Sequence, residues 1–79
     1  MYFVYVLKSK QDGKLYYGLT SNIEKRLAEH NSGSVRSTEH RRPSNLVYYE
    51  TVSTLVEARK REKYSKSGFG RKYIKGRLK

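Results

Sequence analysis

Two short stretches of the chain are dense in apolar and aromatic residues, and each predicts a β-strand. Residues 2–7 are apolar or aromatic at every position, which is typical of a strand covered on both faces and central in its sheet. Residues 46–52 are again apolar on both faces for most of their length. Asp12-Gly13 is a hairpin-turn signal, and residues 15–20 supply the returning strand. We therefore expect the first two strands to pair antiparallel.

The hairpin also predicts which side chains share a face of the sheet. A two-residue turn at Asp12-Gly13 would pair Gln11 with Lys14, and a shift of two residues leaves the faces unchanged. One face then carries Tyr5, Leu7, Tyr16 and Gly18. The opposite face carries Val4, Val6, Leu15, Tyr17 and Leu19. Gly18 leaves a gap beside the two tyrosines, where a backbone or a ligand is able to approach closely.

A capping box predicts the start of the first helix. Ser21 stands at the N-cap position with Glu24 three residues on, and Gly33 is suited to close the helix. Its inward stripe consists of Ile23, Leu27 and His30. Residues 32–45 lack a sustained period and predict a loop that ends in an extended Arg42-Pro43 step.

A second capping box, Thr54 with Glu57, starts another helix that runs to about residue 66. One stripe of this helix comprises Leu55, Ala58, Glu62 and Ser65. Gly68-Phe69-Gly70 is expected to break the helix. Residues 71–79 then form a short basic segment with a terminal turn of helix. The predicted order of elements is ββαβα plus this short C-terminal helix.

The composition narrows the class of protein. The 79 residues make one domain, residues 1–79, with a thin core. The absence of cysteine rules out a disulfide framework or a Cys-rich zinc site, and it fits a reducing compartment and a cytoplasmic protein. No apolar run approaches the roughly 20 residues that span a bilayer, and no helix combines a basic face with a bulky apolar one. We therefore expect no membrane partner.

The net charge points to a polyanionic partner. Eighteen Lys and Arg against seven Asp and Glu give a formal net charge of +11. On so small a surface this creates a positive field that draws polyanions, with nucleic acid the leading partner. Arg36, Arg41 and Arg42 make the loop after the first helix a candidate substrate arm. The alternative is a soluble basic protein without a specific partner.

Two tyrosines and an Arg/His pair are the first candidates for chemistry. Arg26 and His30 lie at i and i+4 on one helix face, where a guanidinium suits a phosphate and an imidazole relays a proton near neutral pH. Tyr5 and Tyr16 are able to orient a water, or to act as a base if nearby cations lower the tyrosine pKa of about 10. The alternatives are a satisfied helix-end histidine, a solvated arginine and two core tyrosines.

Glu62 is a carboxylate on the inward side of a basic helix. It falls seven residues after Leu55 and four after Ala58. An inward carboxylate is costly unless it is paired or holds a cation. Its partner is therefore a side chain such as Arg26 or a divalent metal, and the residues alone leave both open. The other acids are scattered, which disfavours a two-metal site.

Taken in this order, the residues resemble the GIY-YIG nuclease superfamily, in particular small stand-alone members related to the nuclease domain of bacterial excision repair. Phe3-Val4-Tyr5 stands at the first motif and Tyr16-Tyr17-Gly18 at the second. Steps of eleven, ten and four residues lead from Tyr5 through Tyr16 and Arg26 to His30, and they match the family pattern. Arg61-Glu62 matches as well, and the stretch from Lys66 to Arg71 is similar to the tail of short members.

The resemblance implies an α+β fold, a three-stranded antiparallel sheet flanked by helices in the order ββαβα plus a terminal helix. It implies an endonuclease that cleaves DNA rather than RNA, with a role in DNA repair. One divalent cation, Mg or another such as Mn, would be held by Glu62. Lys66 and Arg71, in the tail, are added to the expected nucleic-acid contacts.

The resemblance also implies a role for each central residue. Tyr5 would act as, or position, the base for the attacking water, and His30 would assist the proton transfer. Tyr16 would orient the water or the phosphate. Arg26 would stabilise charge on the phosphate.

Two departures from the family pattern stand out. Phe3-Val4 replaces Gly-Ile in the first motif, which leaves the tyrosine in place. The loop after the first helix reads Val35-Arg36-Ser37-Thr38, where many relatives have a tyrosine before the threonine, so substrate contacts from this loop are not carried over. The alternative to an active enzyme is a nucleic-acid-binding module of the same fold, and the working expectation for the assembly is a monomer.

Overall fold

The computed structural model describes residues 1–36 and 38–78, and a three-stranded antiparallel sheet forms its centre. Strand β1 (Tyr2–Ser9) lies in the middle, flanked by β2 (Leu15–Thr20) and β3 (Ser44–Val52), in the order β2-β1-β3. The uninterrupted apolar run of β1 explains its central place, because both of its faces are covered. The expected α+β fold is confirmed.

The register of the hairpin differs from the predicted one by two residues. Tyr5 pairs with Gly18 and Leu7 with Tyr16. The backbone N–H of Ser9 donates to the Lys14 carbonyl at 3.0 Å, so the loop has four residues instead of the expected two. Because the shift is by two residues, the predicted face of Tyr5, Leu7, Tyr16 and Gly18 is unchanged.

Helix α1 (Ile23–Ser32) begins one residue later than the capping box suggested. Asn22 is the N-cap, and its side chain accepts the backbone N–H of Lys25 at 3.1 Å, so the prediction of Ser21 was wrong. Gly33, at φ 87°, closes the helix as predicted. A short 3₁₀ helix, η1 (Glu39–Arg41), then interrupts the loop that leads to β3.

Helix α1 is fastened to the sheet beside its last turn. The Asn31 amide donates to the Ser44 carbonyl at 3.1 Å and accepts the Ser44 backbone N–H at 2.8 Å. These two bonds join the end of α1 to the first residue of β3. They fix the position of the neighbouring residue, His30, above the sheet.

Helix α2 (Leu55–Lys66) has the predicted N-cap, Thr54, and the predicted end, but the residue that stops it differs from the expectation. The chain turns at Ser67, whose N–H bonds to the Tyr64 carbonyl at 2.9 Å and whose hydroxyl accepts the N–H of Gly70 at 3.2 Å. Ser67 therefore ends α2 and starts α3 (Gly68–Arg77). The glycines expected to break the helix form the first turn of α3.

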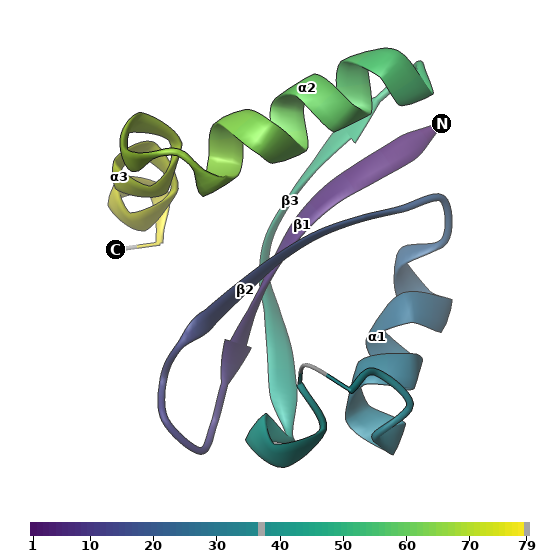
Figure 1. Cartoon of the computed structure of the whole chain (residues 1–79), viewed down its shortest axis with the longest axis vertical. Helices are drawn as coiled ribbons and strands as arrows, with labels where there is room; N and C mark the ends of the chain where they lie inside the picture. Colours follow the sequence, from purple (N-terminus) through teal and green to yellow (C-terminus); the bar gives the residue numbers. More distant parts are fainter. Residues whose placement is uncertain (37, 79) are drawn as a thin grey trace.

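The three helices cover both faces of the sheet (Figure 1). Helix α1 packs on the face that carries Tyr5 and Leu7. Helices α2 and α3 lie on the other side, where Ile74 joins Val6 and Tyr17 in a buried cluster. None of the helices in the described residues has the length and apolar character needed to cross a membrane.

Gly70 permits the close contact between α2 and α3, and its replacement provides a test. A Cβ at this position would overlap the Tyr64 carbonyl oxygen. We expect Gly70→Ala to lower the free energy of unfolding by about 1–3 kcal/mol, the usual cost of overpacking. Gly76→Ala, in the same helix, is the control: its Cβ would meet no atom within 4 Å, and alanine is better than glycine in a helix by about 1 kcal/mol. Denaturant unfolding measures both, and equal stabilities would contradict this account.

Candidate active site

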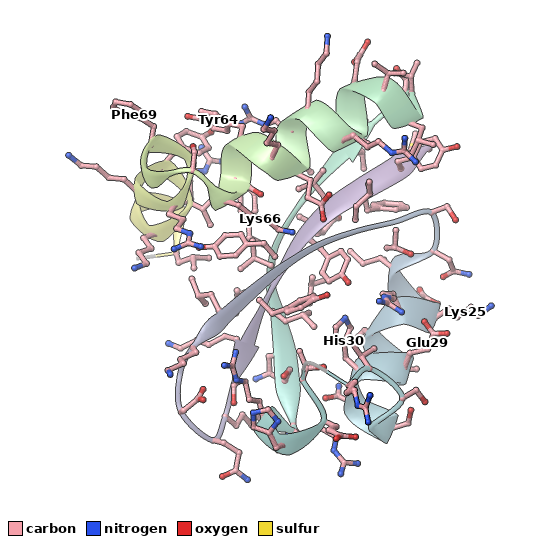
Figure 2. All side chains as sticks on the ribbon, in the orientation of Figure 1. Lys25, Glu29, His30, Tyr64, Lys66 and Phe69 are labelled. Atoms are coloured by element: carbon pink, nitrogen blue, oxygen red, sulfur yellow. The ribbon has the colours of Figure 1, made fainter. Side chains whose placement is uncertain are left out.

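A buried chain of hydrogen bonds joins β1, α1 and the loop before η1 on the face of the sheet that α1 covers. The Tyr5 hydroxyl of β1 lies 3.0 Å from Nε2 of His30, and Nδ1 of His30 lies 2.7 Å from the hydroxyl of Thr38. All three side chains are at most 2% exposed. Figure 2 shows His30 directed from α1 toward the strands, whereas Lys25 and Glu29 of the same helix point outward.

The two hydroxyls that flank His30 have opposite roles, because a neutral imidazole has one donor and one acceptor nitrogen. In one of its two tautomers Nδ1 donates to Thr38, whose own hydroxyl faces the Val35 carbonyl at 3.4 Å. Nε2 then accepts the hydroxyl proton of Tyr5. In this tautomer His30 is placed to receive a proton from Tyr5.

Tyr16 and Gly18 also border the Tyr5 side chain. The Tyr16 ring meets the His30 ring edge to face, with centroids 4.8 Å apart, and lies 6.4 Å from the Tyr5 ring. A Cβ at Gly18 would overlap the Tyr5 hydroxyl oxygen and the carbon that bears it. The gap predicted at Gly18 is therefore filled by Tyr5 itself, neither by a backbone nor by a ligand.

Arg26, one turn before His30, brings positive charge to the tyrosines. Its guanidinium interacts with the Tyr5 hydroxyl, which is the main reason that the pKa of Arg26 is raised. The same guanidinium lies 3.2 Å from the carboxylate of Glu29, and both side chains are about a third exposed. A surface cavity of about 460 Å³ adjoins Arg26 at the start of α1.

Glu62 is nearby but does not pair with Arg26. Its carboxylate lies 3.5 Å from Nζ of Lys66, and its side chain is 26% exposed. Its charge raises the pKa of Tyr5 as a minor contribution. Glu62 is thus partly buried, and the side chain that pairs with it is Lys66; Arg26, the example named from the sequence, pairs with Glu29 instead. The alternative of a divalent metal stays a prediction.

A polar anchor holds α2, and with it Glu62, against the sheet. Arg61 donates two hydrogen bonds to the Glu50 carboxylate, at 2.7 and 3.3 Å. Tyr48 donates to the same carboxylate at 2.5 Å. Burial and this bond raise the pKa of Tyr48 to about 12. Because Arg61 precedes Glu62 directly, the anchor fixes the rotation of α2 near Glu62.

The protonation of the site follows from burial. Burial raises the pKa of Tyr5, and the lowering by Arg26 does not reverse this, so the condition for a tyrosinate base named from the sequence is not met in the free protein. Burial, followed by the charge of Arg26, lowers the pKa of His30. At neutral pH both Tyr5 and His30 are therefore uncharged.

The basic residues expected to bind nucleic acid do not all lie on one surface. Arg41 pairs with Asp12 at 3.7 Å, the Arg42 side chain donates to the Glu39 carbonyl at 2.6 Å, and Arg36 is exposed in the loop. Lys66 lies beside Glu62. Arg71 on α3 lies over the ring of Tyr17 and lines the same cavity as Arg41.

Two residues of the site were missed from the sequence. Thr38 and Glu29 act through His30 and Arg26, and no spacing rule singles out either. The only signal for Thr38 was its place in the loop where relatives have a tyrosine followed by threonine. The position of that tyrosine is Ser37 here, which lies outside the described residues.

Comparison with known proteins gives consistent matches. A family model described as the GIY-YIG catalytic domain matches residues 1–75. A UPF0213 protein of Desulfotalea psychrophila is 49% identical over 63 residues, which cover 77% of this chain and 56% of that protein. One from Staphylococcus saprophyticus is 47% identical over 62 residues, covering 77% and 74%.

A solved structure shares the fold. The solution NMR structure of a UPF0213 protein from Bacillus halodurans superposes with a TM-score of 0.58 at 30% sequence identity. The match covers 96% of this chain and 84% of that one.

The neutral state of His30 predicts a pH dependence of stability. Because the pKa of His30 is lowered by folding, its contribution is fully present above the unfolded value of about 6.5 and is lost as pH falls toward the folded value. We expect the free energy of unfolding in urea to decrease between about pH 7.5 and pH 5.5, where most carboxylates stay ionised. NMR titration of the His30 ring gives its pKa directly, and a value above about 6.5 would contradict the burial argument.

Proposed function

This chain belongs to the GIY-YIG catalytic domain family, and from that membership we propose that it is a metal-dependent endonuclease that hydrolyses phosphodiester bonds in DNA. The observation that carries the proposal is the buried chain from Tyr5 through His30 to Thr38. A core tyrosine needs one partner for its hydroxyl. Here that partner is a neutral histidine that a second hydroxyl contacts from its other side, beside an arginine.

The chain provides a route for the proton of the attacking water. The water gives a proton to the Tyr5 oxygen as the Tyr5 hydroxyl proton passes to Nε2 of His30. The water oxygen attacks phosphorus, the opposite P–O bond breaks, and the leaving oxygen takes up a proton from the solvent. Tyr5 keeps a proton throughout, so its raised pKa does not oppose the step. Tyr16, against the His30 ring, orients the water or the phosphate.

Arg26 supplies the positive charge for the phosphate. Its fork-shaped guanidinium suits the oxygens of a phosphate, and its partly exposed side chain is reached from the cavity at the start of α1. In the free protein Glu29 holds this guanidinium. A phosphate then competes with the Glu29 carboxylate for Arg26. A substrate that is strongly charged, or that forms two hydrogen bonds to the guanidinium, displaces Glu29 more readily than a neutral one.

Glu62 fits a divalent cation of the Mg class. Such ions are held by one or two carboxylates together with waters and substrate phosphates, and Glu62 is a single, partly exposed carboxylate near Tyr5. No group of three or more His, Cys, Asp or Glu ligands occurs among residues 1–36 and 38–78, so the protein alone would form no closed site. When bound by Glu62, Mg or Mn would neutralise charge on the scissile phosphate.

Other parts of the proposal rest on the resemblance and the composition. The preference for DNA over RNA and a role in DNA repair follow from the similarity to the excision-repair nuclease domain. The formal charge of +11 supports a nucleic-acid substrate. A monomer in the cytoplasm is the simplest arrangement in keeping with both.

A nucleic-acid-binding module that cleaves poorly is the second candidate, and one observation favours it. Both charges assigned to catalysis are occupied within the protein, Arg26 by Glu29 and Glu62 by Lys66. If substrate did not displace these partners, the charge would bind nucleic acid without chemistry. The two candidates differ in Mg-dependent cleavage.

Removal of the Glu62 carboxylate tests the metal assignment. We expect Glu62→Ala to abolish Mg-dependent nicking of plasmid DNA, since the cation would lose its protein ligand, while DNA binding in chelator persists. Glu57→Ala, exposed on the first turn of the same helix, is the control and should nick at the wild-type rate. Nicking by Glu62→Ala at the control rate would end the assignment.

The proton route is tested by removing one hydroxyl. Tyr5→Phe should lower the nicking rate by about 100-fold or more, as expected for loss of general base catalysis. Tyr49→Phe, whose side chain is 54% exposed on β3, should leave the rate within about twofold. Rates that fall equally in both variants would indicate an effect on packing instead.

A further inference from the structure

The outer face of α3 carries a basic groove that the proposed active site does not use. A cavity of about 490 Å³ is lined by Gly68, Arg71, Lys72, Lys75 and Gly76. These five residues recur at helical spacing, so they form one stripe along α3. The three cations lie between two glycines. We name this stripe the α3 groove.

The two glycines of the groove have no packing role. Gly70 must be glycine because a Cβ would overlap α2, but a Cβ at Gly68 or Gly76 would meet no atom within 4 Å. Gly68 is the first residue of α3 and Gly76 the last but one, so each costs less than the roughly 1 kcal/mol of a glycine in a helix interior. The bare backbone at both positions lets an extended ligand pass close to the helix.

A second cavity adjoins the groove and contains a polar group without a partner. It measures about 410 Å³ and shares Arg71 and Lys75 with the groove, adding Lys14, Arg41 and Tyr17. Tyr17 is 8% exposed, and its hydroxyl has no hydrogen-bond partner in the described part of the chain. The guanidinium of the exposed Arg71 lies over the Tyr17 ring, 5.7 Å from its centroid.

The charge around both cavities favours an anion. Arg41 is paired with Asp12. Within residues 1–36 and 38–78, no carboxylate lies at ion-pair distance from Arg71, Lys72 or Lys75. A row of unneutralised cations at helical spacing matches the repeated charges of a phosphate backbone, and a buried hydroxyl is a suitable donor to a phosphate oxygen.

We propose that the α3 groove and the adjoining Tyr17 cavity bind the phosphates of a nucleic-acid strand away from the bond that is cleaved. The proposal rests on the proposed function for the identity of the ligand. Arg71 and Lys75 bind phosphates from both cavities, Lys72 extends the contact along α3, and the Tyr17 hydroxyl donates to a phosphate oxygen.

The groove and the proposed active site lie on opposite sides of the sheet. Tyr16 and Tyr17 are neighbours on β2, so they face opposite sides of the sheet, and β2 is an edge strand. A nucleic-acid strand that reaches both sites therefore passes around this edge.

Binding in chelator tests the proposal without requiring cleavage. The probe is a fluorescent 20-nucleotide DNA strand, and the variant is Arg71→Gln with Lys75→Gln. Each phosphate contact contributes about 0.7 to the slope of log affinity against log salt for a single strand, or about fivefold at 0.1 M salt. We expect a loss of about 25-fold and a slope reduced by about 1.4. Lys60→Gln with Lys63→Gln, exposed on α2, removes the same charge, and equal losses in both pairs would overturn the proposal.

Small substitutions separate a ligand site from a structural feature. Gly76→Gln and Tyr17→Phe should each raise or preserve the melting temperature, because one removes a helix glycine and the other an unpaired buried hydroxyl. Both should nevertheless weaken DNA binding by several-fold. Unchanged affinity in both stable variants would refute the site.

Two further arms identify the source of the phosphate and separate the hypotheses. Wild type and the Arg71 and Lys75 variant should bind inorganic phosphate, at up to about 10 mM, with equal affinity. They should also bind anionic phosphatidylserine vesicles equally. Loss of vesicle binding with unchanged DNA affinity would assign the groove to a membrane surface instead. If Glu62→Ala and wild type fail to differ in nicking but the groove variant loses DNA binding, the proposed function fails and the groove stands.

Discussion

A phenol hydroxyl buried between a sheet and a helix must find a hydrogen-bond partner, and much of this fold follows from how Tyr5 finds one. The Tyr5 ring fills the space above Gly18, where a Cβ would overlap its hydroxyl. His30 provides the partner only because Asn31 fastens the last turn of α1 to β3. Thr38 then satisfies the far side of the imidazole. The glycine of the second motif, the end of α1 and the following loop thus serve one buried polar chain, and an unpaired member would cost about 1–3 kcal/mol.

Charge is the second constraint. Within the described part of the chain, four of the seven acids pair with basic side chains, at Arg26, Arg41, Arg61 and Lys66. Only the Arg61 pair, with its two hydrogen bonds to Glu50 and the added bond from Tyr48, has the geometry of a structural anchor. The others are single, partly exposed contacts that contribute little stability. A polyanion is therefore able to compete for Arg26 and Lys66, while α2 stays in place.

The sequence was sufficient where a rule depends on neighbouring residues and insufficient where a contact joins distant ones. Alternation placed Tyr5 and Tyr16 on one face despite an error in the turn, because the register shift was by two residues. Helical spacing placed Arg26 beside His30. It did not reveal that Glu29 would take the Arg26 guanidinium, since an i+3 and an i+4 partner look alike in sequence. Thr38 was missed because its contact depends on the path of an irregular loop.

The glycines of α3 are a second case in which the sequence alone was insufficient. Gly68, Gly70 and Gly76 share one helix, although the sequence predicted that the first two would break one. Only the structure separates them: Gly70 is required by the backbone of α2, and the other two face open space between cations. A glycine that packing does not require, in a helix that it weakens, needs another explanation. β2 is an edge strand with Tyr16 on one face and Tyr17 on the other. A polymer that passes this edge therefore meets Tyr5 and Tyr16 first and the basic side of α3 next. The edge of the sheet thus sets the order of both contacts.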